Sequence, residues 1–354
     1  MLIFSDLHYG ISDDNERRLD DVDRCIDWII EEAQKRNEKT CVFAGDWSHN
    51  RYRLSTQTAD RMKNAISKLN DNFDIVYLIA GNHDYYYNDN HQVCILNLFS
   101  GFKNIILVTE TELLIKHNNK NILLAPWFYD PNGEIGRYDA VIGHFEFVGA
   151  KLANRISERG YSTASLLAVA PLIFSGHYHL TSEIEREAGR IVVIGAPYQQ
   201  DWSDFGNKKR IIFFDGVNYE SVYNEISPTY NKIPYEKIKD VDGEKLKKLF
   251  AHPIYQGGFT KLTVNGEVDY DKLQRIVSVG AGCGLRTFEP DYISITSTIS
   301  ESVSSKMEKG PEKSLKEYVI DFVNKTIDVE NGQFASVSKR EIVELVDNYF
   351  ERLK

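Results

Sequence analysis

The chain has 354 residues, of which 42% are hydrophobic, so it is long enough to bury one large core or two to three smaller ones. It contains no run of 18 apolar residues, and its opening residues carry an aspartate and no lysine or arginine, which argues against a membrane span and a signal peptide. A net charge of −10 argues against a protein that binds nucleic acid unaided, and favours a small anion held by metal or a partner that supplies positive charge.

The first part of the chain alternates strands with helices. Apolar runs predict three strands, at 1–4, 39–46 and 73–84. Helices are expected over 13–36 and 55–69, where apolar residues recur along one stripe, and Ser55 or Thr56 is a suitable N-cap for the second. This order predicts an α/β core with parallel strands.

The middle of the chain is richer in strands. After a short helix expected at 91–99, apolar runs predict strands at 104–109, 112–117, 121–127, 139–145, 170–179, 190–199 and 209–215. Strands spaced this closely late in a domain indicate a second sheet packed on the first.

The composition changes near Ser227 and Pro228. A small α/β unit is predicted from a helix at 243–250, a strand at 259–264, a helix at 269–277 and a strand at 291–297. A polar stretch then reads as a linker, and two amphipathic helices end the chain, the second opening with a capping box from Ser338 to Glu341. The expected domains are 1–228, 229–300 and 314–354, with a linker at 301–313.

Six of the nine histidines stand in polar motifs at the ends of predicted strands. With nearby oxygen donors they form one candidate ligand set: Asp6, His8, Asp46, Asn82, His144, His177 and His179. A lone aspartate at a strand end is usually a cap, and a lone histidine is usually a satisfied polar residue. Five such clusters in order favour a metal site, because open α/β sheets gather ligands beyond the carboxyl ends of their strands.

Local geometry supports the same prediction. In an extended chain, residues i and i+2 point the same way, so Asp6 would face with His8, and His177 with His179. Glycine directly before four of the clusters lets the backbone approach an ion closely. Seven ligands without a thiolate suit two ions of Mn²⁺, Fe or Zn²⁺ that share a bridging carboxylate, and Asp46 is the natural bridge.

These motifs, D-x-H, G-D, G-N-H-D, G-H and G-H-x-H, resemble those of the calcineurin-like metallophosphoesterase superfamily over roughly residues 1 to 225. His49, three residues after Asp46, and Asp84, which ends the third motif, make the chain most similar to nucleases of the SbcD and Mre-eleven type, and above all to their phage versions. The resemblance implies an α/β fold of four layers: two packed mixed sheets flanked by helices, with a small α/β capping domain and C-terminal helices.

The resemblance also implies roles for the residues. It places four on a first metal, Asp6, His8, Asp46 and His179, and four on a second, Asp46, Asn82, His144 and His177. His83 would protonate the leaving sugar oxygen or stabilise the transition state, and His49 would help to seat the DNA phosphate. Asp84 would orient His83 through a hydrogen bond, although a simple turn or cap is an equal alternative. The loop at 194–199 stands where the family has a loop of strictly defined conformation near the site.

The implied activity is a DNA nuclease with two divalent ions, Mn²⁺ in the first place and Mg²⁺, Fe or Zn²⁺ as alternatives. The implied partners are DNA, an SbcC-like (Rad-fifty-like) ATPase bound by the C-terminal helices, and a second copy paired through helices near 55–69 and 91–99. Those C-terminal helices could instead pack on their own nuclease domain. Such a protein belongs in a bacterial or phage-infected cytoplasm, away from membranes, where four cysteines without a C-x-x-C pair stay reduced.

Three rival functions stay open. Another phosphoesterase of this fold could act on nucleotides, lipids or phosphoproteins. A scaffold that has lost catalysis is a second, although all seven ligands are present here. A module that binds nucleic acid without cleaving it is a third, which the acidic charge opposes. For DNA contacts, Arg51, Arg53 and the run 208–210 are basic candidates, each of which could equally be a solvated charge.

Overall fold

The computed structural model describes residues 1–132, 138–265, 268–292 and 343–344. The chain divides into two compact units, Met1–Asp291 and Tyr292–Lys354. Of the second unit, only Tyr292 and the helical pair at 343–344 are described, so the predicted linker and nearly all of the two C-terminal helices lie outside the described residues.

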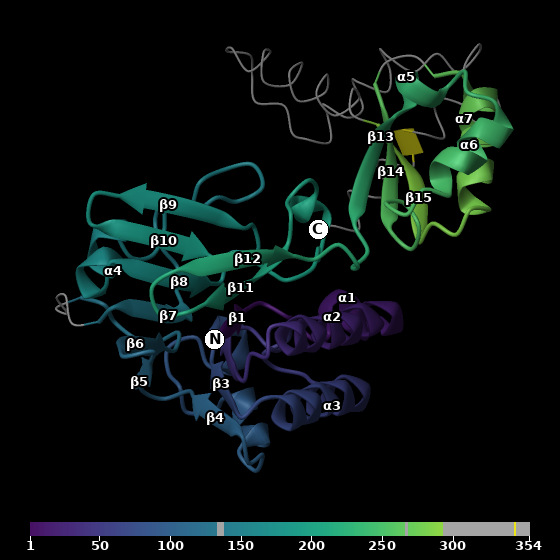
Figure 1. The fold of residues 1–354 in the computed structure, drawn as a ribbon. Helices are drawn as coiled ribbons and strands as arrows, with labels where there is room; N and C mark the ends of the chain where they lie inside the picture. Colours follow the sequence, from purple (N-terminus) through teal and green to yellow (C-terminus); the bar gives the residue numbers. More distant parts are fainter. Residues whose placement is uncertain (133–137, 266–267, 293–342, 345–354) are drawn as a thin grey trace. The chain divides into compact units, whose positions relative to one another are not determined.

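The first sheet has the strand order β12-β11-β1-β2-β3-β4 (Figure 1). Its parallel part is β1 (Leu2–Phe4), β2 (Thr40–Ala44), β3 (Ile75–Ile79) and β4 (Ile105–Val108). The strands β11 (Arg210–Phe214) and β12 (Tyr219–Tyr223) complete it in antiparallel register. All four parallel strands therefore end at the same edge.

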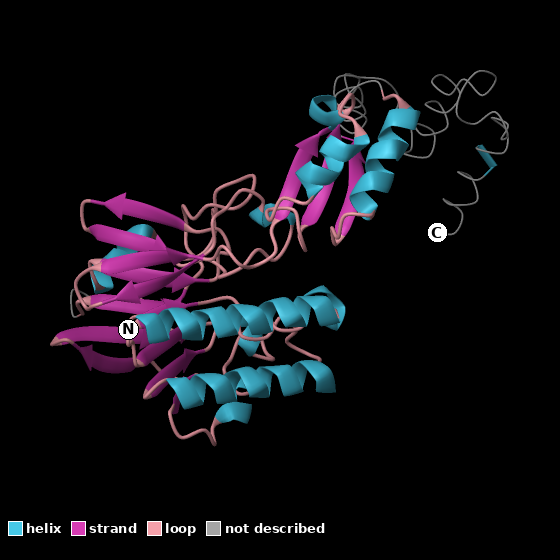
Figure 2. Cartoon of the chain, turned by 45° about the vertical axis from the view of Figure 1, so that its right-hand side comes forward, coloured by secondary structure: helices cyan, strands magenta, loops and turns pink. Residues whose placement is uncertain are grey.

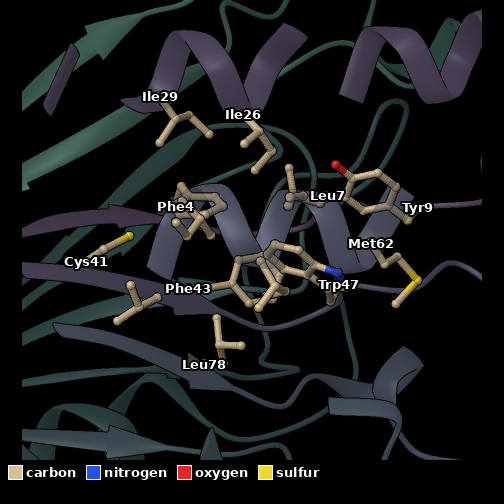
Figure 3. Close-up of a cluster of buried hydrophobic side chains, with 14 of the residues drawn as sticks. Phe4, Leu7, Tyr9, Ile26, Ile29, Cys41, Phe43, Trp47, Met62 and Leu78 are labelled. Atoms are coloured by element: carbon tan, nitrogen blue, oxygen red, sulfur yellow. The ribbon is translucent and has the colours of Figure 1, made fainter. Parts of the chain in front are cut away.

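Two long helices, α2 (Glu16–Lys35) and α3 (Thr56–Asn72), cover the outer face of this sheet (Figures 1 and 2). Their apolar stripes pack on the sheet in one core, in which Phe4, Phe43 and Trp47 meet Ile26 of α2 (Figure 3). Ser55 caps α3 as expected, since its hydroxyl accepts the N–H of Thr58 at 3.1 Å.

The second sheet has the order β5-β6-β7-β8-β10-β9. Its strands are β5 (Leu113–His117), β6 (Lys120–Ala125), β7 (Ala140–His144), β8 (Leu172–Gly176), β9 (Ser182–Arg186) and β10 (Gly189–Val193). β6, β7, β8 and β10 are parallel, and the edge strands β5 and β9 run antiparallel. The helix α4 (Thr163–Val169) packs against β8 and β10.

A second core lies between the two sheets. Val42 and Ile79 of the first sheet share it with Ile142 and Phe174 of the second, and each is fully buried. The layers therefore run helices, sheet, sheet, helix, as the four-layer fold requires (Figure 2).

A third sheet, β13-β14-β15, belongs to the part of the chain that follows Pro228. It comprises β13 (Tyr230–Pro234), β14 (Phe259–Val264) and β15 (Thr287–Tyr292), with α5 (Tyr235–Ile238), α6 (Gly243–Phe250) and α7 (Tyr270–Ala281). Leu246, Phe250, Leu262 and Ile276 give it a core of its own. α6 and β14 have the predicted bounds.

Several elements differ from the sequence prediction. The helix expected over 13–36 is broken into α1 (Ile11–Asp14) and α2, because Ser12 and Asp13 have left-handed backbones, with φ of 59° and 54°. The short helix expected at 91–99 is a 3₁₀ helix over Ile95–Phe99. The last strand begins at Thr287, four residues before the predicted start.

Short or half-exposed elements were missed altogether. They are α4, α5, β9, β12 and β13, which lack a long apolar run. Within the part of the chain that the structure describes, no helix is long and apolar enough to cross a membrane.

Candidate metal centre

The predicted ligands gather where the parallel strands of both sheets end. Asp6 follows β1, Asp46 follows β2, Asn82 follows β3, His144 ends β7, and His177 follows β8 by one residue. His8 and His179 stand two residues further on. The carboxyl ends of two packed sheets thus bring together side chains up to 173 positions apart in the sequence.

The backbone at this centre is strained. Asp6, His8, Asp46 and His177 have left-handed φ angles of 57°, 50°, 64° and 81°. Asp6 was expected to face with His8, and His177 with His179, along extended chain. That expectation is wrong for the backbone, because turns rather than strand geometry bring the paired side chains together. Such backbone costs about 1–3 kcal/mol per residue and clusters at functional sites. It is held here by bonds such as Asp6 N–H to Gly45 O at 2.9 Å.

Two glycines make the close packing of these turns possible. Gly45 has φ of 98°, and a Cβ there would lie 2.8 Å from the Cα of Gly81. A Cβ on Gly176 would lie 2.8 Å from Nδ1 of His144. Any larger residue would therefore push a predicted ligand out of place.

Asp6, His8 and His179 form the first cluster, with one ligand atom of each lying within 4.8 Å of the others. Nε2 of His8 lies 3.0 Å from Nε2 of His179 and 3.8 Å from Oδ1 of Asp6. Asp6 is fully buried, and neither of its carboxylate oxygens has a hydrogen-bond partner among the described residues. Burial raises the pKa of this carboxyl group. An unsatisfied buried carboxylate facing two imidazoles fits a bound cation.

Asp46, His144 and His177 form the second cluster, with Asn82 among them. Nδ1 of His144 donates to the carbonyl oxygen of Ala44 at 2.8 Å, which turns Nε2 toward Oδ1 of Asn82 at 3.1 Å. The same amide oxygen lies 2.9 Å from Nδ1 of His177. A carboxylate, an amide oxygen and two oriented imidazoles also fit a divalent ion.

Asp46 links the two clusters. Its Oδ2 lies 3.5 Å from Nε2 of His8 in the first cluster and 3.4 Å from Nε2 of His144 in the second. Its Oδ1 accepts the backbone N–H of His83 at 2.8 Å, which fixes the carboxylate. One oxygen of Asp46 therefore stands between both clusters, in the position of a bridging ligand.

The charges of the centre follow from its burial. Burial lowers the pKa of His8, and it lowers the pKa of His177 to about 3, so both imidazoles are neutral and able to coordinate. Burial acts in the same direction on His144, but the negative charge of Asp46 outweighs it and raises the pKa of His144 to about 9. Burial would raise the pKa of Asp46, yet the neighbouring histidines, led by His144, hold it well below its usual value.

His83 and His49 lie beside the first cluster. Their rings stack with centroids 5.8 Å apart at 19°, and the His83 ring lies edge-on to His8. Nδ1 of His83 lies 2.7 Å from the carbonyl oxygen of His49, which can only accept, so Nδ1 carries the proton. Nε2 of His83 is then the nitrogen left for proton exchange.

Asp84 makes the contacts of a turn or cap, the second of its two expected roles. Its buried carboxylate accepts four backbone N–H groups, from Asp46 at 2.9 Å, Trp47 at 2.9 Å, Ser48 at 3.1 Å and Gly81 at 2.9 Å. No hydrogen bond to the side chain of His83 is found among the described residues. Asp84 therefore joins the loops after β2 and β3, and orients the His83 ring at most through them.

Two supporting residues, Trp127 and Gln200, were not predicted from the sequence, and a third, Tyr198, lies in the loop at 194–199 that was expected near the site. The ring of Trp127 lies 5.9 Å from that of His144 and 5.1 Å from that of His177. Nε2 of Gln200 donates to the carbonyl oxygen of Asp6 at 2.6 Å. The hydroxyl of Tyr198 donates to the carbonyl oxygen of Leu7 at 2.8 Å. Trp127 follows the end of β6 by two residues, as several predicted ligands follow their strands, and this position in the sequence could have identified it.

Similarities to known proteins indicate the family of this chain. Residues 1–181 match the family of calcineurin-like phosphoesterases. The chain is 22% identical over 351 residues to exonuclease subunit 1 of Enterobacteria phage T4, with 94% of each chain covered. Solved structures that are similar include a novel archaeal phosphodiesterase, at 13% identity and a TM-score of 0.34 over 63% of this chain and 98% of that one. The phosphopantetheinyl hydrolase of Mycobacterium tuberculosis is similar at 12% identity and a TM-score of 0.36, over 62% of this chain and 94% of that one. Since the family match spans just over half of its length, the chain belongs to the calcineurin-like phosphoesterase family, whose members are metal-dependent hydrolases of phosphoester bonds.

Proposed function

We propose that this protein is a two-metal DNA nuclease, a double-strand exonuclease and single-strand endonuclease, acting as a subunit of an SbcCD-like complex in DNA end processing, recombination and repair. The observation that carries the proposal is the position of Asp46 Oδ2 between two clusters of buried ligands. A pair of ions sharing a carboxylate is the arrangement that cleaves phosphodiesters.

The residues divide the chemistry between them. Asp6, His8, Asp46 and His179 would hold one ion, and Asp46, Asn82, His144 and His177 would hold the other. When bound, two divalent ions neutralise the phosphate and lower the pKa of a water molecule. His83 keeps Nδ1–H on the carbonyl of His49, so its Nε2 is the nitrogen that takes up a second proton, and the ring protonated on both nitrogens would give this proton to the leaving oxygen. His49, stacked on His83, helps to seat the phosphate.

The choice of DNA as substrate rests on the relative in phage T4, which aligns over nearly the whole of both chains. That relative is named as a subunit of an exonuclease, which supports a complex with a second protein. We propose an SbcC-like (Rad-fifty-like) ATPase as that protein, bound by the helices of 314–354. Mn²⁺ is the proposed ion, and the bacterial or phage-infected cytoplasm the proposed location.

The test is a Mn²⁺-dependent nuclease assay on linear duplex and single-stranded DNA, with and without the ATPase partner. His83→Ala should keep both metals, by calorimetric titration, and lose cleavage at least a hundredfold. His91→Ala is the matched control, because His91 is exposed and belongs to neither cluster. Cleavage at the wild-type rate by His83→Ala would remove its catalytic role.

The rival functions give different outcomes in the same assay. Hydrolysis of nucleotides or phosphoproteins with no cleavage of either DNA would favour another phosphoesterase of this fold. Metal binding without any hydrolysis would favour a scaffold or a binding module.

We also propose a homodimer that includes the chain around the 3₁₀ helix at 95–99. Tyr86, Val93 and Leu98 are exposed there, and Leu98 keeps 69% of its surface accessible, as Tyr52 keeps 63%. The outward face of α3 is polar, so the apolar contact would come from these residues. Leu98→Glu should turn a dimer into a monomer in analytical ultracentrifugation, whereas Val217→Glu, at a site of similar exposure on the β11-β12 turn, should not. A wild-type chain that sediments as a monomer would contradict this.

A further inference from the structure

A cavity of about 1030 Å³ opens beside the metal centre. His177 and His179 of the two clusters line one side of it. The other side is formed by the loop between β7 and α4, which contributes three basic residues and two acidic ones: Lys151, Arg155, Arg159, Glu146 and Glu158. Its volume exceeds that of most pockets for one small ligand, which span about 300–1,000 Å³.

The basic side chains of this cavity are unoccupied by protein partners. Lys151, Arg155 and Arg159 are exposed, and across the described residues their side chains form no ion pair or hydrogen bond. Lys209 and Arg210, two of the basic residues named as candidates for DNA contacts, do have protein partners. Lys209 is buried against Asp204, and Arg210 is paired with Glu183 at 3.0 Å.

The loop holds these cations in a defined place. Its backbone folds back on itself through Gly149 N–H to Ser157 O and Ser157 N–H to Ala150 O, at 2.9 and 2.8 Å. The hydroxyl of Tyr178 donates to the carbonyl oxygen of Phe147 at 2.8 Å and lies 2.9 Å from Oγ of Ser157. Tyr178 stands between two predicted ligands in the sequence, so the loop is tied to the metal centre itself.

We propose that this cavity is a subsite for the backbone phosphates that flank the scissile phosphate of a nucleic-acid strand, with Lys151, Arg155 and Arg159 as its cationic contacts. The inference rests on the proposed function and adds the surface that recognises the substrate. The three basic residues outnumber the two glutamates of the lining, so this wide, open cavity has a net positive charge in an otherwise acidic chain, which suits a polyanionic strand. A phosphodiester strand bound there would run from the cavity across the metal clusters.

The test measures binding, so that it does not depend on cleavage. The full-length chain in EDTA is titrated into a fluorescent single-stranded 20-mer between 50 and 200 mM salt, and anisotropy is recorded. The triple variant Lys151→Ala, Arg155→Ala, Arg159→Ala should bind at least tenfold more weakly. Because each phosphate contact contributes about −0.7 to the salt slope on single strands, the slope should become shallower by about 2.

The matched control carries the same change in charge elsewhere. Lys39, Lys103 and Lys116 are exposed lysines outside the cavity, and their triple alanine variant should bind within twofold of the wild type. Circular dichroism checks that both variants fold. Equal binding by the wild type and the cavity variant would overturn the inference, as would a wild type that does not bind the strand. A wild type that binds through these residues but cleaves no DNA would keep the inference and refute the proposed nuclease.

Discussion

Asp84 provides the sharpest test of how the centre is built. The sequence left two roles for Asp84, a partner for the side chain of His83 or a turn or cap, and the structure gives its carboxylate four backbone N–H groups from two loops. Replacing Asp84 therefore disturbs the loops that carry Asp46 and Asn82. The variants Asp84→Ala and Asp84→Asn should then lose stability and metal binding together, because each removes acceptors from these N–H groups.

The expected loss can be worked from these four bonds. A buried N–H without an acceptor costs about 1–3 kcal/mol, so four would cost about 4–12 kcal/mol if nothing replaced the carboxylate. A water molecule in the vacated space can serve one or two of them. We therefore expect the free energy of unfolding to fall by about 3–6 kcal/mol for Asp84→Ala, and by a similar amount for Asp84→Asn, whose amide nitrogen is a donor and would face two backbone N–H groups.

The measurement is urea unfolding of the EDTA-treated protein, followed by circular dichroism and tryptophan fluorescence. Asp215→Ala is the matched control, because Asp215 also accepts two backbone N–H groups, from Val217 and Asn218, but in an exposed turn that water can reach. The free energy of unfolding should fall only by a small fraction of the fall expected for Asp84→Ala. Asp84 variants as stable as this control, with cleavage alone impaired, would refute the reasoning and restore a direct role on His83.

Three further changes test the surroundings of the centre. Gly176→Ala places a Cβ 2.8 Å from Nδ1 of His144, so Mn²⁺ affinity by calorimetry should fall at least tenfold, and an unchanged affinity would show that the strand can shift. Asp21→Ala leaves the buried Arg18 without the carboxylate 2.8 Å away, and urea unfolding should show a loss of about 3–5 kcal/mol; a loss under 1 kcal/mol would mean that Arg18 finds another partner. Trp127→Ala removes the ring beside His144, so Mn²⁺ affinity should drop about tenfold with little change in the melting temperature of the EDTA-treated protein, whereas equal loss of both would make its role purely structural.

The sequence predicted the layers well because strand order and apolar runs carry that information. Asp6, Asp46 and Asn82 follow parallel strands of one sheet, and His144 and His177 end or follow strands of the other, so their meeting follows from topology alone. Family resemblance added how the ligands divide into two groups, which spacing could not provide.

What the sequence could not predict lies in the turns. The left-handed backbones of Asp6 and His8 depend on hydrogen bonds to Gly45 and Asp46, whose chain lies on another strand. Asp84 has four acceptor positions available, and only the folded loops decide which donors reach them. The basic loop at 151–159 has no regular pattern, and its place beside His177 follows from Tyr178 rather than from any local signal.

The local charge at the metal centre also differs from the net charge of the chain. Asp6, Asp46 and Asp84 bring three carboxylates into one buried volume, and burial together with the charge of Asp46 raises the pKa of Asp84 to about 7. Two divalent cations would make the net charge of this volume positive. The adjoining cavity extends the positive charge, because its three basic residues outnumber Glu146 and Glu158. An acidic protein can therefore present a cationic path to a phosphodiester strand, because the field at a cleft is set by the groups that line it rather than by the net charge of the chain.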